Sequence, residues 1–120
     1  HEPPNAFATH HAKYFANSIR EDGLLTIARH GLLFVRGNAG TVQEIFQDAC
    51  QNYYAPDEDV SPMVLLGTRY WTEERPAAEL LHRLSEKAHN AQFREWVVVT
   101  DDVEEALDVF RRYAEHRGKA

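Results

Sequence analysis

The sequence is poor in cysteine, in long apolar runs and in positive charge. Its 120 residues include one cysteine, Cys50, so no internal disulfide can form and a reducing cytoplasm is the expected setting. No apolar stretch approaches the roughly 20 residues that span a bilayer, and no signal-peptide pattern is visible, so we expect no membrane partner. The net charge of -6 argues against a nucleic-acid backbone as a partner.

The spacings typical of metal and dinucleotide sites are also missing. The chain contains no H-E-x-x-H, C-x-x-C or G-x-G-x-x-G pattern. His82 and His89 fall on one expected helix, where we expect them to face solvent and not a metal. The sequence therefore predicts a site without a metal or any other cofactor.

The composition is that of a folded domain. Hydrophobic residues make up 43% of the chain and aromatic residues 11%, which is typical of a globular protein and not of a disordered one. The length predicts a single domain over residues 1–120 that buries roughly two thirds of its unfolded surface. The chain starts at His1 without a methionine and its first strong strand follows residue 30, so we expect a piece of a longer polypeptide.

Residues 32–44, which read LLFVRGNAGTVQE, are the most informative stretch of the chain. The unbroken apolar run at 32–35 predicts a strand buried on both faces, as in a parallel sheet covered by helices. Gly37 and Gly40 allow a tight turn and a close approach of a ligand to the backbone. A helix starting at Thr41 would point its free N–H groups and its positive dipole end at the same place. Strand, turn and helix start together predict a phosphate site.

The rest of the chain continues this alternation of strands and helices. The further predicted elements are strands at 62–67 and 96–100, and helices from Thr41 to a point before Pro56, from Pro76, and from Asp101 or Asp102. The expected buried stripe of the second of these helices is Ala77, Leu80, Leu81, Leu84 and Ala88, and that of the last is Val103, Ala106, Leu107 and Phe110. Strands that alternate with helices predict an α/β fold with a parallel sheet and right-handed crossovers.

The first thirty residues carry a weaker signal. Residues 1–9 are predicted to be an extended lead-in, and an apolar stripe predicts an amphipathic helix over 12–19 with a second helical piece over 24–29. The strand at 32–35 is too apolar for an open sheet edge. Its partner could be absent N-terminal strands, a second copy of the chain, or a rearranged helix.

Residues 36–44, R-G-N-A-G-T-V-Q-E, resemble the P-G-G-x-G-T-x-x-E signature of the LOG (Lonely Guy) family. These are Rossmann-like proteins, and characterised members are phosphoribohydrolases that cleave the base from a nucleoside 5′-monophosphate. The resemblance extends from about Ala12 to the C-terminus, through an apolar strand before Gly67 and the pair Tyr70 and Trp71. It implies a Rossmann-like three-layer arrangement, part of a larger doubly wound domain whose N-terminal half we expect to lie outside this chain.

The resemblance also implies roles for individual residues. The phosphate cradle would consist of Gly37, Asn38, Ala39, Gly40 and Thr41. Glu44 matches the catalytic glutamate of the family. Family members also use an arginine on the preceding helix, and Arg20 lies one position from the matching register. The implied partner is a nucleoside monophosphate or a related phosphorylated small molecule, and the typical assembly is a homodimer, for which the helix over 41–54 would be a main contact.

Several alternatives stay open. Arg36 stands where the family has proline and either adds charge for the phosphate or blocks the pocket, whereas Asn38 replaces a glycine and tolerates positive φ. Thr41 and Glu44 also match a capping box, in which both side chains satisfy N–H groups at a helix start. Tyr70 is expected in the core or an interface. A non-catalytic nucleotide- or phosphate-binding regulatory module, or an interaction domain without a ligand, would fit the same sequence.

Overall fold

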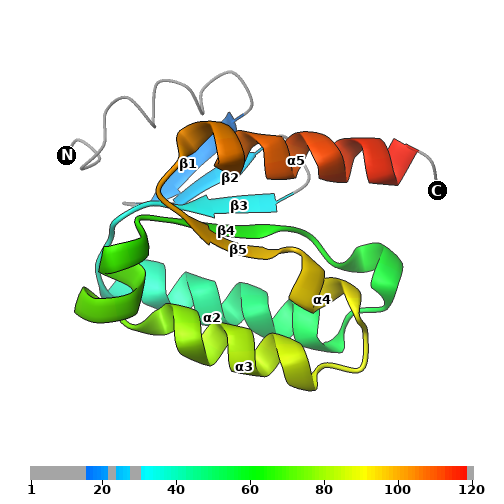
Figure 1. The fold of residues 1–120 in the computed structure, drawn as a ribbon, viewed down its shortest axis with the longest axis horizontal. Helices are drawn as coiled ribbons and strands as arrows, with labels where there is room; N and C mark the ends of the chain where they lie inside the picture. The colour runs from blue at the N-terminus through cyan, green and yellow to red at the C-terminus, as the bar shows by residue number, and fades with distance from the viewer. Residues whose placement is uncertain (1–15, 22–23, 28–30, 119–120) are drawn as a thin grey trace.

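One five-stranded sheet organises the protein, in the order β1-β2-β3-β4-β5. The structure is a computed structural model that describes residues 16–21, 24–27 and 31–118, with side chains described for Leu24 and for 31–118 (Figure 1). The strands are β1 (Ala16–Glu21), β2 (Leu24–Ile27), β3 (Gly31–Phe34), β4 (Met63–Leu66) and β5 (Val97–Thr100). The helices are α2 (Ala39–Tyr54), α3 (Ala77–Lys87), α4 (Gln92–Glu95) and α5 (Val103–Gly118), with a 3-10 turn η1 (Asp57–Asp59) and a π-helical turn η2 (Tyr70–Glu74).

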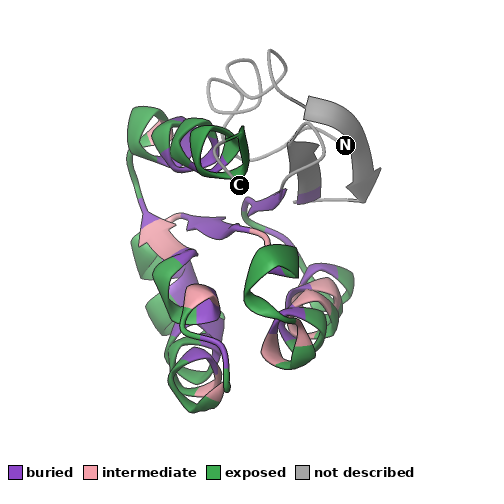
Figure 2. Cartoon of the chain, turned by 90° about the vertical axis from the view of Figure 1, so that its right-hand side faces the viewer, coloured by how far each residue is buried: buried purple, intermediate pink, exposed green. Residues whose placement is uncertain are grey.

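The layers follow from how the chain crosses between parallel strands. β3, β4 and β5 are parallel, whereas β1 and β2 continue the sheet in an antiparallel manner. Both crossovers step in the same direction, so right-handed connections put α2 and α3 on one face. α5 covers the opposite face, and the sheet lies between the two helical layers (Figures 1 and 2). The predicted α/β fold, with a parallel sheet in a Rossmann-like three-layer arrangement, is confirmed.

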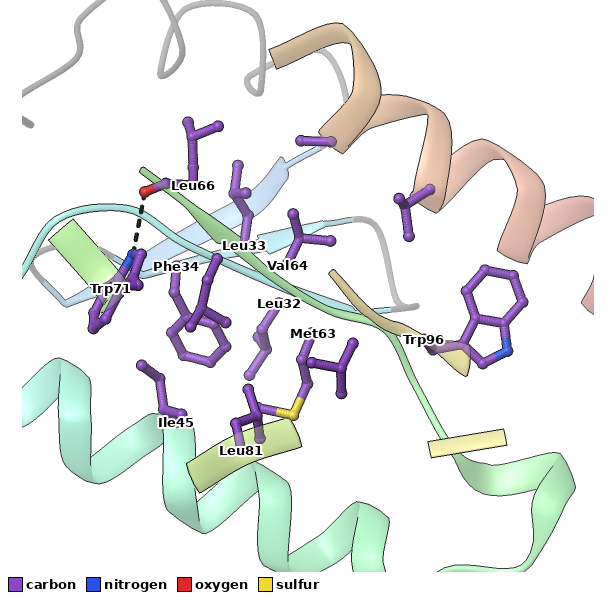
Figure 3. Packing of buried hydrophobic residues seen from close by; sticks show 14 of the residues in the cluster. Leu32, Leu33, Phe34, Ile45, Met63, Val64, Leu66, Trp71, Leu81 and Trp96 are labelled. Carbon is purple, nitrogen blue, oxygen red and sulfur yellow. Dashed lines mark hydrogen bonds between the residues drawn. The ribbon is translucent and has the colours of Figure 1, made fainter. Parts of the chain in front are cut away.

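The core lies on both faces of the parallel strands. All residues of β3 and β4 are buried. Figure 3 shows Phe34 and Met63 on the side of Ile45 and Leu81, whereas Leu33 lies on the other side of the sheet. This explains why these strands lack alternation in the sequence, since each face has a helical layer to pack against. Each fully buried side chain of this kind contributes about 1.5–3 kcal/mol.

The predicted helices before residue 30 are wrong where the structure describes them. Residues 16–21 and 24–27 form β1 and β2, while 1–15 and 28–30 lie outside the described residues. β2 pairs antiparallel with β3, with Leu24 opposite Phe34. The physical reason is the apolar edge of β3, which needs a hydrogen-bonded neighbour. The third of the expected partners, a rearranged helical segment, is therefore the one that pairs with this edge of β3, as the strand β2.

The predicted elements after residue 60 are confirmed within two residues. The strands at 62–67 and 96–100 become β4 and β5, and the helices after Pro76 and Asp102 become α3 and α5. One stripe residue was placed wrongly: Leu80 is 52% exposed, because the buried face of α3 is centred on Leu81. The helices are amphipathic, and within the described part of the chain none combines the length and apolar character needed to cross a membrane.

Candidate functional site

The turn between β3 and α2 lies at the carboxyl edge of the parallel sheet, where ligands bind in α/β proteins. Asn38 is the N-cap of α2, since its carbonyl accepts from the amide of Val42 at 3.1 Å. Its side chain makes no capping hydrogen bond, and residues 38–40 are exposed. The side chain of Asn38 therefore accepts no hydrogen bond from the first-turn amides of α2. The first two residues of this exposed helix start, Ala39 and Gly40, are small.

The helix starts two residues earlier than predicted, and this changes the role of Thr41. With Asn38 at the N-cap, Thr41 is the third helical residue and is 1% exposed. The capping-box interpretation of Thr41 and Glu44 is therefore wrong, because a capping box needs its Thr at the N-cap. Asn38 has φ of -108° and ψ of -152°, so it adopts an extended conformation and the turn makes no use of its tolerance for positive φ.

Glu44 lies in the second turn of α2, about 8 Å along the helix axis from Ala39. It is half-buried, as is Asp48 one turn further on. Phe46 and Tyr53, on the other flank of the helix, line a hollow together with Leu84 of α3. Glu44 and Asp48 thus lie on the flank of α2 that is turned away from α3. Glu44 lies between one and two helical turns from the exposed start of α2, and Asp48 lies a further turn along the helix.

Arg36 is a cationic residue at this turn, and its guanidinium contacts two residues of η2. Its guanidinium lies 5.2 Å from the centroid of the Tyr70 ring, and its Nη2 is 3.7 Å from Oε1 of Glu74. The hydroxyl of Tyr70 donates to the carbonyl of the buried Gly37. The Tyr70 ring packs edge-to-face on Trp71 at 4.8 Å, and Trp71 donates to the carbonyl of Leu66 at 3.1 Å (Figure 3).

Gly67 explains how η2 reaches the turn after β3. It has φ of 109°, a conformation that L side chains rarely adopt. Its amide donates to the carbonyl of Thr100 at 2.8 Å, and its carbonyl accepts from the amide of Trp71 at 3.0 Å. The chain therefore turns sharply at the end of β4, and this brings Tyr70 and Glu74 beside Gly37. The sequence does not predict the contact of Tyr70 with Gly37 or that of Glu74 with Arg36. The aromatic pair after Gly67 indicates buried side chains, but it does not indicate which residues they contact.

Arg20 lies on β1 and not on a helix, so the predicted placement of this residue is wrong. Its neighbours Ile19 and Glu21 pair with Leu25 and Leu24, and a register shift falls between them. Glu21, Leu24 and Phe34 thus form one row across the sheet at the carboxyl end of β3. The backbone of Arg20 is near this edge, about 10 Å from β3, because β2 lies between them. Its role as a helper cation stays a prediction.

Three hollows lined by described residues lie away from this turn. One of about 900 Å³ runs along α3 beside Val99, and one of about 480 Å³ lies between η1 and α5. The third, of about 350 Å³, is the apolar hollow between α2 and α3. Among the described residues no group of three His, Cys, Asp or Glu side chains could hold a metal ion.

The fold and the turn define a class, an α/β protein with an exposed helix start at the carboxyl edge of its sheet. No protein family, no curated protein and no solved structure matches the chain. The resemblance to LOG proteins therefore rests on the sequence itself, above all on residues 36–44.

Proposed function

We propose that the protein binds a nucleoside 5′-monophosphate by its phosphate at the start of α2 and hydrolyses the bond between ribose and base. The observation that carries this proposal is the exposed start of α2, without a side-chain cap, beside the cation Arg36. Backbone N–H groups and the helix dipole attract anions, and Ala39 and Gly40 let a phosphate approach the backbone closely. Gly37, Asn38 and Thr41 complete this phosphate cradle.

The proposed reaction needs one carboxylate and water. As the bond from C1′ to the base nitrogen breaks, its electron pair leaves with the base and positive charge develops on the ribose. Water adds to C1′, and Glu44 accepts the proton of that water and stabilises the charge. The base nitrogen takes up a proton, and ribose 5-phosphate and free base are the products. Arg20 would support the phosphate or the water, and the anchored phosphate would position the sugar.

A binding titration and a product assay test this function together. Calorimetry with AMP and CMP measures binding of the purified protein, and a ribose 5-phosphate assay measures its turnover. We expect Glu44→Gln to lower turnover by about 100-fold or more while AMP binding persists, the size of effect that loss of acid–base catalysis produces. Turnover that survives in Glu44→Gln would contradict the assignment.

A non-catalytic nucleotide- or phosphate-binding regulatory module is the second candidate. Two observations favour it. Arg36 and Asn38 differ from the residues of the LOG signature. Glu44 lies more than one helical turn from the exposed start of α2. Binding of AMP by the protein without release of ribose 5-phosphate would support this candidate over the hydrolase. A failure to bind AMP or CMP would instead favour an interaction domain without a ligand.

We also propose a homodimer in which α2 is a main contact. The exposed residues of α2 are all uncharged: Ala39, Gly40, Gln43, Gln47, Cys50, Gln51 and Tyr54. Each chain carries a net charge of -6, so two copies repel each other least when they meet through a face without charged residues. Depletion of charge and exposed aromatic rings are typical of interface cores, and Tyr54 is 78% exposed beside the apolar hollow.

The dimer is tested by placing one carboxylate on this face. We expect Tyr54→Asp to weaken self-association by about tenfold or more, since it buries a charge against its own symmetry copy. Ala114→Asp, which adds the same charge on the exposed side of α5, is the matched control. Sedimentation measures the self-association of both variants, and equal self-association would contradict a contact through α2.

We also propose that the protein acts in the cytoplasm, which suits the exposed Cys50 and the proposed nucleotide substrate.

A further inference from the structure

Two ion pairs of different kinds are formed by neighbouring glutamates of η2. Arg69 and Glu73, separated by 3.9 Å, belong to the same segment of chain. Arg36 and Glu74, separated by 3.7 Å, join the turn after β3 to η2. The Arg36 and Glu74 side chains are 57% and 50% exposed. Ion pairs this exposed add little to folding stability, so a stabilising role explains the Arg36–Glu74 pair poorly.

Arg36 has a second contact in addition to its ion pair with Glu74. The Tyr70 ring lies under the guanidinium, and the Tyr70 hydroxyl donates to the carbonyl of Gly37, the residue after Arg36. Tyr70 therefore gives the cation a contact beside the start of α2 that does not depend on Glu74. Only the carboxylate of Glu74 has to give way when another anion arrives.

We propose that Glu74 competes with the ligand phosphate for the guanidinium of Arg36, which makes Arg36 the residue that distinguishes a nucleoside 5′-monophosphate from its nucleoside. This inference rests on the phosphate site proposed above. A phosphate dianion carries twice the charge of a carboxylate and offers Arg a bidentate partner. In the proposed site it also binds the amides of α2 at the same time, whereas among the described residues the Glu74 carboxylate pairs with the guanidinium alone. A nucleoside without phosphate leaves the pair with Glu74 intact.

A double-mutant cycle in AMP binding tests the competition. Glu74→Gln removes the competitor and keeps the shape of the side chain, so we expect AMP to bind about two- to fivefold tighter, the range that one half-exposed ion pair allows. Glu73→Gln removes the same charge from the neighbouring position and is the matched control, with an expected change below about twofold. Adenosine serves as the ligand without phosphate, and its affinity stays the same in both variants.

The background of Arg36→Gln separates competition from simple repulsion. If Glu74 acts through Arg36, Glu74→Gln gives no gain in AMP affinity once Arg36 is replaced. A gain that persists in Arg36→Gln/Glu74→Gln, or an equal gain in Glu73→Gln, would overturn the inference and leave the phosphate site standing. A wild-type chain that binds AMP no better than adenosine would overturn the phosphate site and the inference together. Circular dichroism of each exposed-site variant verifies that the fold is retained.

Discussion

The hydrogen bond from Tyr70 to Gly37 gives a sharp test of how the candidate site is held. Tyr70→Phe removes the hydroxyl that donates to the Gly37 carbonyl and leaves the ring, with its packing on Trp71, in place. Tyr70 is 9% exposed and Gly37 is buried, so water replaces the lost donor poorly. A net hydrogen bond is worth about 0.5–1.5 kcal/mol, and an unsatisfied buried carbonyl costs about 1–3 kcal/mol. We therefore expect Tyr70→Phe to lower the free energy of unfolding by about 1–2 kcal/mol.

Urea denaturation followed by circular dichroism measures this loss, which corresponds to a fall in Tm of about 3–8 °C for a domain of this size. Tyr53→Phe is the matched control. Tyr53 is half-buried on α2, its ring lies 4.9 Å from that of Tyr54, and its hydroxyl makes no hydrogen bond to any described residue. We expect the control to stay within about 0.5 kcal/mol of the wild type. If Tyr70→Phe loses no more than Tyr53→Phe, the bond to Gly37 does not stabilise the turn and the reasoning fails.

Two further predictions concern packing. Gly31→Ala should destabilise the fold by about 1–3 kcal/mol, because a Cβ there would lie 2.7 Å from the carbonyl oxygen of Pro62 and 2.8 Å from the Phe110 ring. Urea denaturation measures this loss, and a mutant as stable as the wild type would show that the sheet and α5 can move apart to make room for the methyl group. Leu81→Ala should cost about 2–5 kcal/mol, since Leu81 is fully buried, whereas Leu80→Ala should change the free energy of unfolding by less than about 1 kcal/mol; a reversed order of the two in thermal melts would contradict the observed face of α3.

Much of the candidate site could be predicted from local sequence, and its surroundings could not. The apolar run, the glycine-bearing turn and the helix start are contiguous, so the sequence places residues 37–41 at one edge of the sheet. The helix start was wrong by two residues, because Thr41 resembles an N-cap and Asn38 is one. Tyr70 lies 33 positions from Gly37, and no periodicity links residues so far apart. The partner of Arg36 was therefore found only in the folded chain.

The sequence by itself determined the parallel strands β3, β4 and β5 and, between them, the helices α2 and α3. An apolar run without alternation needs cover on both faces, and in an α/β chain only a helix on each side supplies it. The tertiary structure alone decided what pairs with the outer edge of β3. Short apolar segments fit helix and strand alike, and residues 24–27 became a strand because the open backbone of β3 offered hydrogen bonds that a helix could not make.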